Sequence, residues 1–579
     1  MNFNNMLKDD ELKKILLKEK TLRPDKVRKA LRQARKDKIS LASELIKQGL
    51  ISEQELVEIF SEKAKIPYVS LKKKRISRDV LLLIPEPIAR NHQVIAFEKE
   101  RNKLRLAMVD PTDLQTIEFI KKKTGMEIEA SLVTASDVAE VLKQYRKSLK
   151  TEFSKIVEEV PKAQGEEELR EMAQRLPVVK IVDTFLEYAI YENASDIHVE
   201  PLEKEIIVRY RVDGVLRDVM NLPKKILPGV VARIKVLSDL KIDEHRLPQD
   251  GRFKTETDEY KISFRVSVIP VFNGEKIVMR LLSESTKPLN LEGLGLRKNA
   301  LKIVQLNIKR PHGMILSTGP TGSGKTTTLY SVLHILNTPE INICTIEDPI
   351  EYHMPRINQS QVKPKIGYTF ASGLRSLLRQ DPDVIMVGEI RDRETAEMAV
   401  HSALTGHLVL STLHTNSAAG AIPRLIDMHI EPFLVASTVN VIVAQRLVRR
   451  ICSNCIESYY LDKKMWKNVG RQINLKKLLA ILAKEGVIVS SKTKPNSLLF
   501  YRGRGCSQCN DTGYKGRVAA LEVLEVTEEI QKLAIQKTST EVIERKAIDE
   551  GMITMLEDGF YKAKMGITTI EEVLRVTTE

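Results

Sequence analysis

Hydrophobic residues recur at helical spacing in the first part of the chain, and the pattern repeats. Residues 12–31 align with residues 41–60 at an offset of 29 positions. The matched pairs are Leu12/Leu41, Leu16/Leu45, Leu17/Ile46, Lys18/Lys47, Val27/Leu56 and Leu31/Phe60. Since apolar residues three or four positions apart lie on one face of a helix, the repeat predicts two related helical units. We place this helical module at residues 1–66.

The pattern then changes to shorter apolar runs. Val94–Phe97 and Leu104–Val109 are typical of strands, and helical signals follow them, so we predict a small α/β module at residues 67–149. Residues 150–175 are rich in charged side chains and lack a strong apolar stripe. We therefore expect an interdomain linker with helical tendency there.

A second α/β module is predicted at residues 176–289. Ile206–Val212 alternates like a strand, and Asp213-Gly214 supplies a hairpin turn directly after it. Further strands are predicted at Tyr260–Ile269 and Lys276–Leu282.

Apolar strands alternate with helical stretches in the last part of the chain, residues 290–579. This alternation is typical of a parallel sheet with helices on both faces. The chain has 579 residues, 42% of them hydrophobic, which is enough for three or four packed domains.

A glycine-rich segment lies between a predicted strand, Met314–Thr318, and a predicted helix that reaches Leu336. The segment fits the pattern Gly-x-x-x-x-Gly-Lys-Thr and consists of Gly319, Pro320, Thr321, Gly322, Ser323, Gly324, Lys325, Thr326 and Thr327. In such a loop the backbone N–H groups converge on phosphates, while Lys325 would reach the β- and γ-phosphates and Thr326 would bind Mg²⁺. A glycine-rich turn that precedes Lys-Thr by chance would not explain the strand and helix on the correct sides. We therefore predict that the chain binds a nucleoside triphosphate.

Carboxylates follow two of the predicted strands. The strand Ile341–Ile346 ends in Glu347-Asp348-Pro349-Ile350-Glu351, and the strand Val384–Val387 runs into Gly388-Glu389. The carboxyl ends of parallel strands face the ligand crevice, where acids hold Mg²⁺ and polarise water. A solvated turn is an equally good interpretation of residues 347–351, whereas Glu389 is the leading candidate for the catalytic carboxylate.

The next predicted strand, Leu408–Ser411, ends in Thr412-Leu413-His414-Thr415-Asn416. Several hydrogen-bonding groups thus lie at the same predicted edge, where they can sense a γ-phosphate. A lone histidine is usually structural, but the positions of His407 and His414 beside this strand favour a role for His414.

Four of the five cysteines form two Cys-x-x-Cys pairs, Cys452/Cys455 and Cys506/Cys509. Four thiolates are the set that a closed structural zinc site needs, and they leave no open position for catalysis. The 50 residues between the pairs exceed the spacing of a compact zinc ribbon, so two unrelated cysteine turns are the alternative. The intervening residues, with Trp466 and Leu478–Ile488, predict a helical insertion.

Basic residues are in excess, with 92 Lys and Arg against 77 Asp and Glu. This excess favours anionic partners, although a solvated helical face explains much of it. Charged residues interrupt the first 17 positions, and no apolar run approaches the roughly 20 residues that span a membrane, so we expect no signal peptide and a cytosolic protein.

Taken together, the motifs resemble those of the secretion ATPases that drive type IV pilus assembly and type II secretion. The resemblance extends from about Ala42 to Thr577. Besides the phosphate loop and the four cysteines, it depends on Ala194–Pro201, Leu247–Arg252, Glu347–Glu351, Leu378–Asp383, Gly388–Asp392 and Thr405–Asn416.

The resemblance implies an α/β fold with a RecA-like phosphate-loop ATPase core, a preceding small α/β (PAS-like) domain, and an N-terminal helical plus α/β region. It implies a homo-hexameric motor that hydrolyses ATP with Mg²⁺, carries Zn²⁺ in the four-cysteine element at 452–509, and assembles a pilus or a secretion pseudopilus. It also implies a cytoplasmic position with peripheral association at the inner membrane, where a polytopic platform protein would be the partner.

Site residues are implied by the same resemblance. The family's acids correspond to Glu347, Asp348, Glu351 and Glu389, and its histidines to His407 and His414. Its arginines correspond to Arg265, Arg280, Arg375 and Arg391, which would approach the γ-phosphate. Arginines brought in by domain closure stabilise the charge that builds up on a transferring phosphoryl group.

The N-terminal repeat also resembles a paired motif with which some relatives bind cyclic di-GMP. The Arg-Leu-Gly that opens each motif is replaced by Glu11-Leu12-Lys13 and by Ser40-Leu41-Ala42, and the closing glutamine by Ala34 and Lys63. We therefore expect the fold of that module without the ligand, and a role in docking a partner.

Two other functions are compatible with the phosphate loop. A ring motor that translocates nucleic acid would suit the basic excess, but only 5% of residues are aromatic, no nucleic-acid module is recognisable, and we expect no nucleic acid. A non-catalytic scaffold gated by a nucleotide is the second alternative.

Overall fold

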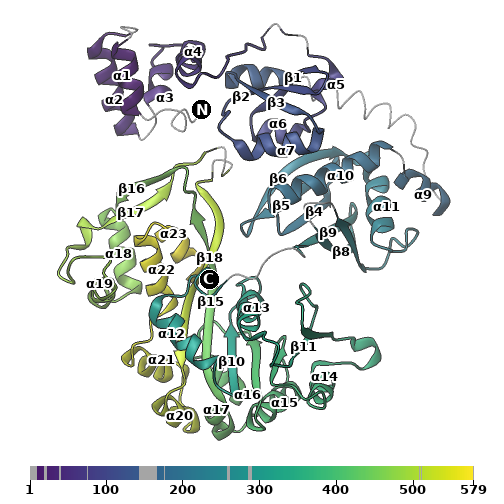
Figure 1. Ribbon diagram of the computed structural model, residues 1–579, viewed down its shortest axis with the longest axis vertical. Helices are drawn as coiled ribbons and strands as arrows, with labels where there is room; N and C mark the ends of the chain where they lie inside the picture. Colours follow the sequence, from purple (N-terminus) through teal and green to yellow (C-terminus); the bar gives the residue numbers. More distant parts are fainter. Residues whose placement is uncertain are drawn as a thin grey trace. The chain divides into compact units, whose positions relative to one another are not determined.

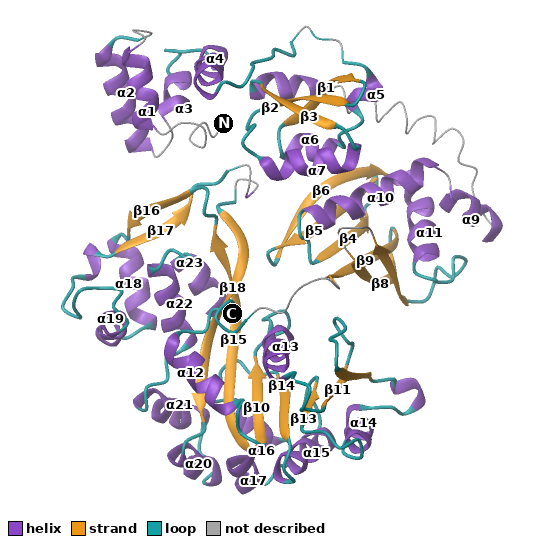
Figure 2. Cartoon of the chain, viewed as in Figure 1, coloured by secondary structure: helices purple, strands orange, loops and turns teal. Residues whose placement is uncertain are grey.

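The computed structural model describes most of the chain as two compact units (Figures 1 and 2). The described residues are 9–18, 22–37, 41–72, 74, 76–142, 166–174, 176–256, 261–283, 290–506, 509 and 512–577. The first unit is Met1–Ser283 with Cys452–Cys455 and Arg504–Gly513, and the second is Glu284–Ile451, Ile456–Gly503 and Tyr514–Glu579. The cysteine segments thus group with the first unit, not with the rest of residues 290–579, a grouping that sequence order alone does not reveal.

Four helices open the first unit and confirm the predicted repeat. They are α1 (Asp9–Lys18), α2 (Pro24–Asp37), α3 (Leu41–Lys47) and α4 (Glu53–Ala64). The paired positions Leu12 and Leu41, and Val27 and Leu56, are all buried in one apolar cluster. The repeat therefore marks the residues that pack the two helix pairs together.

The small α/β module contains a three-stranded sheet in the order β1-β2-β3. Its strands are β1 (Val94–Glu100), β2 (Lys103–Met108) and β3 (Glu127–Leu132), and its helices are α5 (Arg78–Leu81), α6 (Glu86–Asn91) and α7 (Leu114–Thr124). The two predicted strands are confirmed. The predicted linker lies largely outside the described residues, within which α9 (Glu166–Gln174) agrees with the helical tendency.

The second α/β module contains a six-stranded antiparallel sheet in the order β6-β5-β4-β9-β8-β7. Its strands are β4 (Asp196–Pro201), β5 (Glu205–Val212), β6 (Val215–Pro223), β7 (Gln249–Glu256), β8 (Lys261–Val271) and β9 (Gly274–Ser283), and its helices are α10 (Leu176–Tyr191) and α11 (Leu227–Leu237). The hairpin turn is confirmed, with φ 51° at Asp213 and 87° at Gly214.

A buried ionic cluster joins the two α/β modules of the first unit. His92, which follows α6, contacts Asp113 through Nδ1 at 3.2 Å and Glu192, which follows α10, through Nε2 at 3.1 Å. Burial lowers the pKa of His92, but the two carboxylates outweigh it and raise that pKa to about 9. The imidazolium form is therefore the one that this contact stabilises.

The second unit is built on a seven-stranded sheet in the order β12-β11-β13-β14-β10-β15-β18. Its strands are β10 (Gly313–Thr318), β11 (Ile343–Glu347), β12 (Ile357–Gln361), β13 (Val384–Val387), β14 (Leu408–Leu413), β15 (Val439–Ile451) and β18 (Tyr514–Glu525). Neighbouring strands run parallel, except that β18 is antiparallel to β15. The predicted parallel sheet is thus confirmed, with one antiparallel strand added at an edge.

Both faces of this sheet are covered, as Figure 2 shows. Met314 and Leu316 belong to one apolar cluster and Ile315 belongs to another, so alternate side chains of β10 pack on opposite faces. Helix α12 (Lys298–Asn307) precedes the first strand. The helices between β10 and β15 are α13 (Lys325–Leu336), α14 (Phe370–Leu377), α15 (Arg393–Leu404), α16 (Ala421–Asp427) and α17 (Pro432–Thr438).

A helical insertion and a helical end complete the second unit. The insertion contains β16 (Ile456–Tyr460), α18 (Lys463–Gln472), α19 (Leu475–Lys484) and β17 (Leu499–Gly503), and the end contains α20 (Glu528–Ile535), α21 (Thr540–Asp549), α22 (Met555–Lys564) and α23 (Ile570–Thr577). Trp466 is buried in an apolar cluster that includes Leu478 and Phe560, which confirms the predicted insertion. Over the described residues, no helix combines the length and the apolar character needed to cross a bilayer.

The cluster around His92 predicts a pH-dependent contribution to stability. Because the pKa is raised from 6.5 to about 9 on folding, the contribution is complete below pH 6.5 and is lost as the pH rises through 9. Its size is on the order of 3 kcal/mol. His92→Gln should therefore raise amide hydrogen exchange in α7 and α10 at pH 6.5, and should raise it much less at pH 9.5. An equal increase at both values would contradict the assignment.

Candidate functional site

The segment Gly319–Thr327 connects β10 to α13 and has the backbone of a phosphate loop. Gly319, Gly322 and Gly324 adopt φ values of 143°, 78° and 91°, a region that side-chain-bearing residues rarely enter. A Cβ atom at Gly319 would lie 2.5 Å from the carbonyl oxygen of Gln445. Gly324 is the N-cap residue of α13, so the N–H groups of the first helical turn face the loop. This backbone forms a cradle for an anion.

The side chains of the loop fit a phosphate group. Lys325 is largely buried, and its Nζ donates to the carbonyl oxygens of Gly319 at 2.8 Å and Pro320 at 3.1 Å. Burial lowers the pKa of Lys325, and the charge of Glu389 acts in the opposite direction. The buried Ser323 hydroxyl has no hydrogen-bond partner within the described part of the chain. A triphosphate would supply the acceptors that these groups need.

The side chain of Gln445, on β15, supports the phosphate loop. This role was not predicted from the sequence. Its Nε2 donates to the carbonyl oxygen of Ser323 at 3.0 Å, and its Oε1 accepts from Thr328 Oγ1 at 2.8 Å. One amide side chain thus fixes both the loop and the first turn of α13. No motif signalled this role, because Gln445 is more than one hundred positions away in the sequence.

Glu389, Arg391 and His414 come together beside the carboxyl ends of β13 and β14. Glu389 Oε1 lies 2.8 Å from Arg391 Nε, and Glu389 Oε2 lies 3.3 Å from His414 Nε2. The Glu389 carboxylate is only 12% exposed, whereas the Arg391 side chain is 68% exposed. The carboxylate is therefore held between two nitrogen donors, one of which is free to move into solvent.

Glu347 at the end of β11 is directed into the protein. It accepts hydrogen bonds from the Tyr330 hydroxyl of α13, from Thr345 Oγ1 at 2.5 Å and from Gln359 Nε2 at 3.2 Å. Burial raises the pKa of Glu347, which these donors oppose. These contacts tie α13 to β11 and β12, which is a structural role. The catalytic role of Glu347 stays a prediction, and these contacts do not support it.

The other residues of that acidic segment lie nearer the surface. Asp348 is exposed and Glu351 is half-buried, and the backbone N–H of Glu351 donates to the Tyr330 hydroxyl at 3.4 Å. His407 contacts the carbonyl oxygen of Ser402 through Nδ1 at 2.9 Å, which turns its ring toward the end of α15. Of the two predicted histidines, only His414 contacts Glu389.

The predicted arginines lie in both units. Arg375 of α14 is exposed and donates to Glu394 Oε1 at 3.3 Å. In the first unit, Arg252, Arg265 and Arg280 lie opposite one another on β7, β8 and β9. All three are exposed. Cross-strand neighbours share a face of the sheet, so these residues form a row of three cations, which we call the arginine row.

One carboxylate borders the arginine row. Arg280 Nε contacts Asp196 Oδ1 of β4 at 3.1 Å, and Arg211 Nε contacts the other oxygen, Oδ2, at 3.4 Å. Like charges directly opposite one another are unfavourable, and a polyanion would relieve that repulsion. Arg265 and Arg280 were predicted as site residues, whereas Arg252 joins them only through the register of β7.

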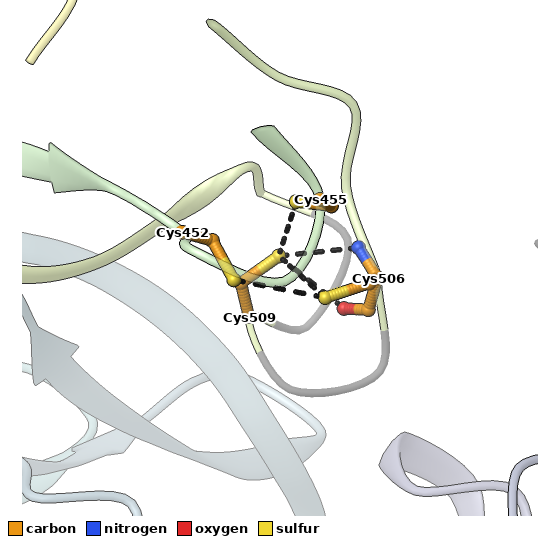
Figure 3. A group of neighbouring side chains, drawn as sticks. All are labelled: Cys452, Cys455, Cys506 and Cys509. Atoms are coloured by element: carbon orange, nitrogen blue, oxygen red, sulfur yellow. Dashed lines mark hydrogen bonds between the residues drawn. The ribbon is translucent and has the colours of Figure 1, made fainter. Parts of the chain in front are cut away.

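The four cysteines lie together, as Figure 3 shows. Their sulfur atoms all lie within 4.8 Å of one another, and all four side chains are buried. Three sulfur–sulfur distances are 3.7, 3.8 and 3.6 Å, for Cys452–Cys506, Cys455–Cys509 and Cys506–Cys509. A tetrahedron with zinc–sulfur bonds of about 2.3 Å has edges of about 3.8 Å. The donor set and its spacing therefore fit a structural Zn²⁺ ion.

Comparison with known proteins gives matches over nearly the whole chain. The family model described as Type II/IV secretion system protein matches residues 171–575, and the MshEN domain model matches residues 64–152. The chain is 41% identical over 572 residues to the type IV pilus assembly ATPase PilB of Myxococcus xanthus, covering 97% of this chain and 98% of the relative. It is 45% identical over 428 residues to the type II secretion system protein E of Pseudomonas aeruginosa, covering 74% and 80%.

A solved structure supports the fold. The ATPase DotB of Legionella pneumophila is 23% identical, with a TM-score of 0.51, and the alignment covers 69% of this chain and 95% of that chain. The predicted RecA-like core is thus confirmed at the level of the fold.

The cysteine cluster predicts one zinc ion per chain. Cys506→Ser removes one of four thiolates, so we expect zinc loss and a melting temperature several degrees lower, because metal binding contributes directly to folding. The measurement is zinc content by mass spectrometry together with thermal denaturation. Cys344→Ala, which alters a buried thiol outside the cluster, should retain zinc. Full zinc content in Cys506→Ser would contradict the assignment.

Proposed function

The chain belongs to the Type II/IV secretion system protein family, whose relatives include ATPases of type IV pilus assembly and type II secretion, and on this premise we propose that it is a hexameric motor. The motor converts ATP hydrolysis into subunit movement that assembles a type IV pilus or a type II secretion pseudopilus. The observation that carries the proposal is the position of Glu389, Arg391 and His414 beside a phosphate loop built for a triphosphate.

Five side chains of the second unit have separate roles in this proposal. The loop N–H groups and Lys325 bind the β- and γ-phosphates. Thr326 would hold a Mg²⁺ ion, which would neutralise phosphate charge. Glu389 orients the attacking water and accepts its proton, and His414 holds the Glu389 carboxylate in place. Arg391 can leave Glu389 for the γ-phosphate, since its side chain is 68% exposed.

The arginine row completes the site in the same proposal. Arg265 and Arg280 would approach the γ-phosphate when two halves of the site close, and the mutual repulsion within the row favours that movement. Arg375 would join them from α14. ATP thus becomes the polyanion that the row binds, and its hydrolysis weakens the contact. This cycle of closing and opening is the proposed power stroke.

The proposed role in filament assembly also determines the location and the partners that we propose for the motor. We place the motor on the cytoplasmic side of the inner membrane, peripherally associated with it and docked on a polytopic platform protein. The N-terminal helices α1 to α4 are the proposed docking module. Binding of cyclic di-GMP is not part of the proposal, because the motif residues differ at positions 11–13 and 40–42. The MshEN domain class binds cyclic di-GMP, so the MshEN match speaks against the expectation that this chain does not bind it. The match covers residues 64–152 and does not include positions 11–13 or 40–42.

Replacement of Glu389 tests the catalytic assignment. Glu389→Gln keeps the shape of the side chain but cannot accept a proton, so we expect kcat for ATP to fall about 10²- to 10⁴-fold with little change in nucleotide affinity. Lys325→Ala should lose both turnover and nucleotide affinity, because the ammonium group of Lys325 binds the phosphates. The matched control is Glu397→Gln on the exposed surface of α15, which should behave like the wild-type protein. Turnover within twofold of wild type in Glu389→Gln would favour the nucleotide-gated scaffold.

Stimulation of hydrolysis tests the class of partner. Vesicles that contain acidic phospholipid should raise the steady-state ATPase rate, because a basic protein at a membrane meets an anionic surface. Single-stranded DNA at the same phosphate concentration should not, and both rates are compared at two salt concentrations to separate general charge effects. Strong stimulation by DNA alone would support the nucleic-acid-translocating ring in place of the secretion motor.

A further inference from the structure

A buried carboxylate beside the site has no part in the mechanism described so far. Glu522 lies on β18 and is 3% exposed. Its Oε1 accepts the backbone N–H of Ala418 at 2.8 Å, and its Oε2 accepts the backbone N–H of Met555 at 3.3 Å. A buried acid is costly unless such donors satisfy it. One side chain therefore holds two backbone segments that are far apart in the sequence.

The first of these segments carries His414. The loop between β14 and α16 spans residues 414–420, and Thr415 fixes its beginning: the Thr415 N–H donates to Thr318 Oγ1 at 2.9 Å, and the two hydroxyl oxygens lie 2.7 Å apart. Glu522 fixes the same loop three residues later, at Ala418. The loop that places His414 against Glu389 is thus held at two points.

The register of the sheet places the two residues that hold the loop, Thr318 and Glu522, in the same cross-strand row. Thr318 of β10 lies opposite Ala444 of β15, and Ala444 lies opposite Glu522 of β18. Cross-strand neighbours share a face, so Thr318 and Glu522 point to the same side of the sheet with the short alanine between them. The residue between them, Ala444, is small and fully buried.

The second segment is the start of α22. Met555 is its first residue, and Thr554 forms a capping box with Glu557, so the Glu522 carboxylate accepts one of the free N–H groups at the helix N-terminus. Burial raises the pKa of Glu522 to about 7, the charges of Glu544 and Glu557 act in the same direction, and the two N–H donors oppose them. The two N–H donors thus favour the ionised form of the carboxylate, which burial opposes.

We propose that Glu522 is a positioning residue, which sets the loop of His414 for hydrolysis and couples that loop to α22. The proposal depends on ATP hydrolysis at the site described above. Any shift of the loop when ATP is bound or hydrolysed changes the Ala418 contact, and the same carboxylate carries this change to the N-terminus of α22. The C-terminal helices thereby respond to the state of the nucleotide through one shared hydrogen-bond acceptor.

The test compares Glu522→Gln with Glu525→Gln, an acid on the same strand that accepts a hydrogen bond from Asn307 and does not contact the loop. The amide introduced by Glu522→Gln would keep one acceptor but place a donor against the second backbone N–H. We expect kcat to fall at least tenfold, with KM and the affinity for a fluorescent ADP analogue within twofold of wild type, because the phosphate loop is unchanged. Glu525→Gln should match wild type in all three.

A second readout separates positioning from a general loss of stability. In the wild-type protein, a non-hydrolysable ATP analogue should change amide hydrogen exchange in residues 414–420 and in α22, and Glu522→Gln should lose the response in α22. If Glu522→Gln does not fold, Thr415→Val removes the hydroxyl at the other attachment point and should reproduce the kcat loss at unchanged KM.

Two results overturn the inference and are distinct from failure of the proposed function. Wild-type kcat in Glu522→Gln, or equal losses in kcat and nucleotide affinity, would show that Glu522 does not position the loop. If the wild-type protein shows no ATPase activity that Lys325→Ala abolishes, hydrolysis at this site is refuted instead. That outcome does not depend on the results for the Glu522 variants.

Discussion

The aligned ends of β10, β13 and β14 are the constraint on which the site depends. Thr318 lies opposite Leu413, and Val387 opposite Ser411, so these parallel strands end at one edge of the sheet. The phosphate loop, Glu389 and His414 follow those ends directly. A shift of one residue in the register would turn each side chain to the opposite face and separate these groups. The chemistry of the site is therefore a consequence of strand pairing before it is a property of any single residue.

Buried polar side chains convert this alignment into fixed loops. Where backbone groups of a loop are buried, they cannot bond to water, so neighbouring side chains must supply their hydrogen bonds. Gln445 holds the phosphate loop, Thr318 and Glu522 hold the loop of His414, and the Tyr330 hydroxyl joins α13 to Glu347. These groups lie on three strands and one helix, which is how packing throughout the second unit reaches the reacting atoms. The arginine row, by contrast, is exposed on its sheet.

Much of this arrangement could be predicted from the sequence, where local patterns determine structure. The helical repeat, the apolar strands and the glycine spacing of the phosphate loop were predictable because each depends on neighbouring residues. Among the strands that were not individually predicted, β7 and β12 lack a strand's apolar alternation, because β7 contains Gly251 and Arg252 and β12 is the largely polar run Ile357–Gln361. The roles of Gln445 and Arg252 could not be predicted, because they arise from strand register between segments distant in the sequence.

The central proposal is that the chain hydrolyses ATP only when copies of it assemble into a hexamer. The most direct measurement is the specific ATPase activity over a wide range of protein concentration, with the mass of the assembly determined in the same samples. The account predicts low activity for the isolated chain and a rise that follows the appearance of a hexamer. Full activity per chain in samples that contain only monomer would contradict it.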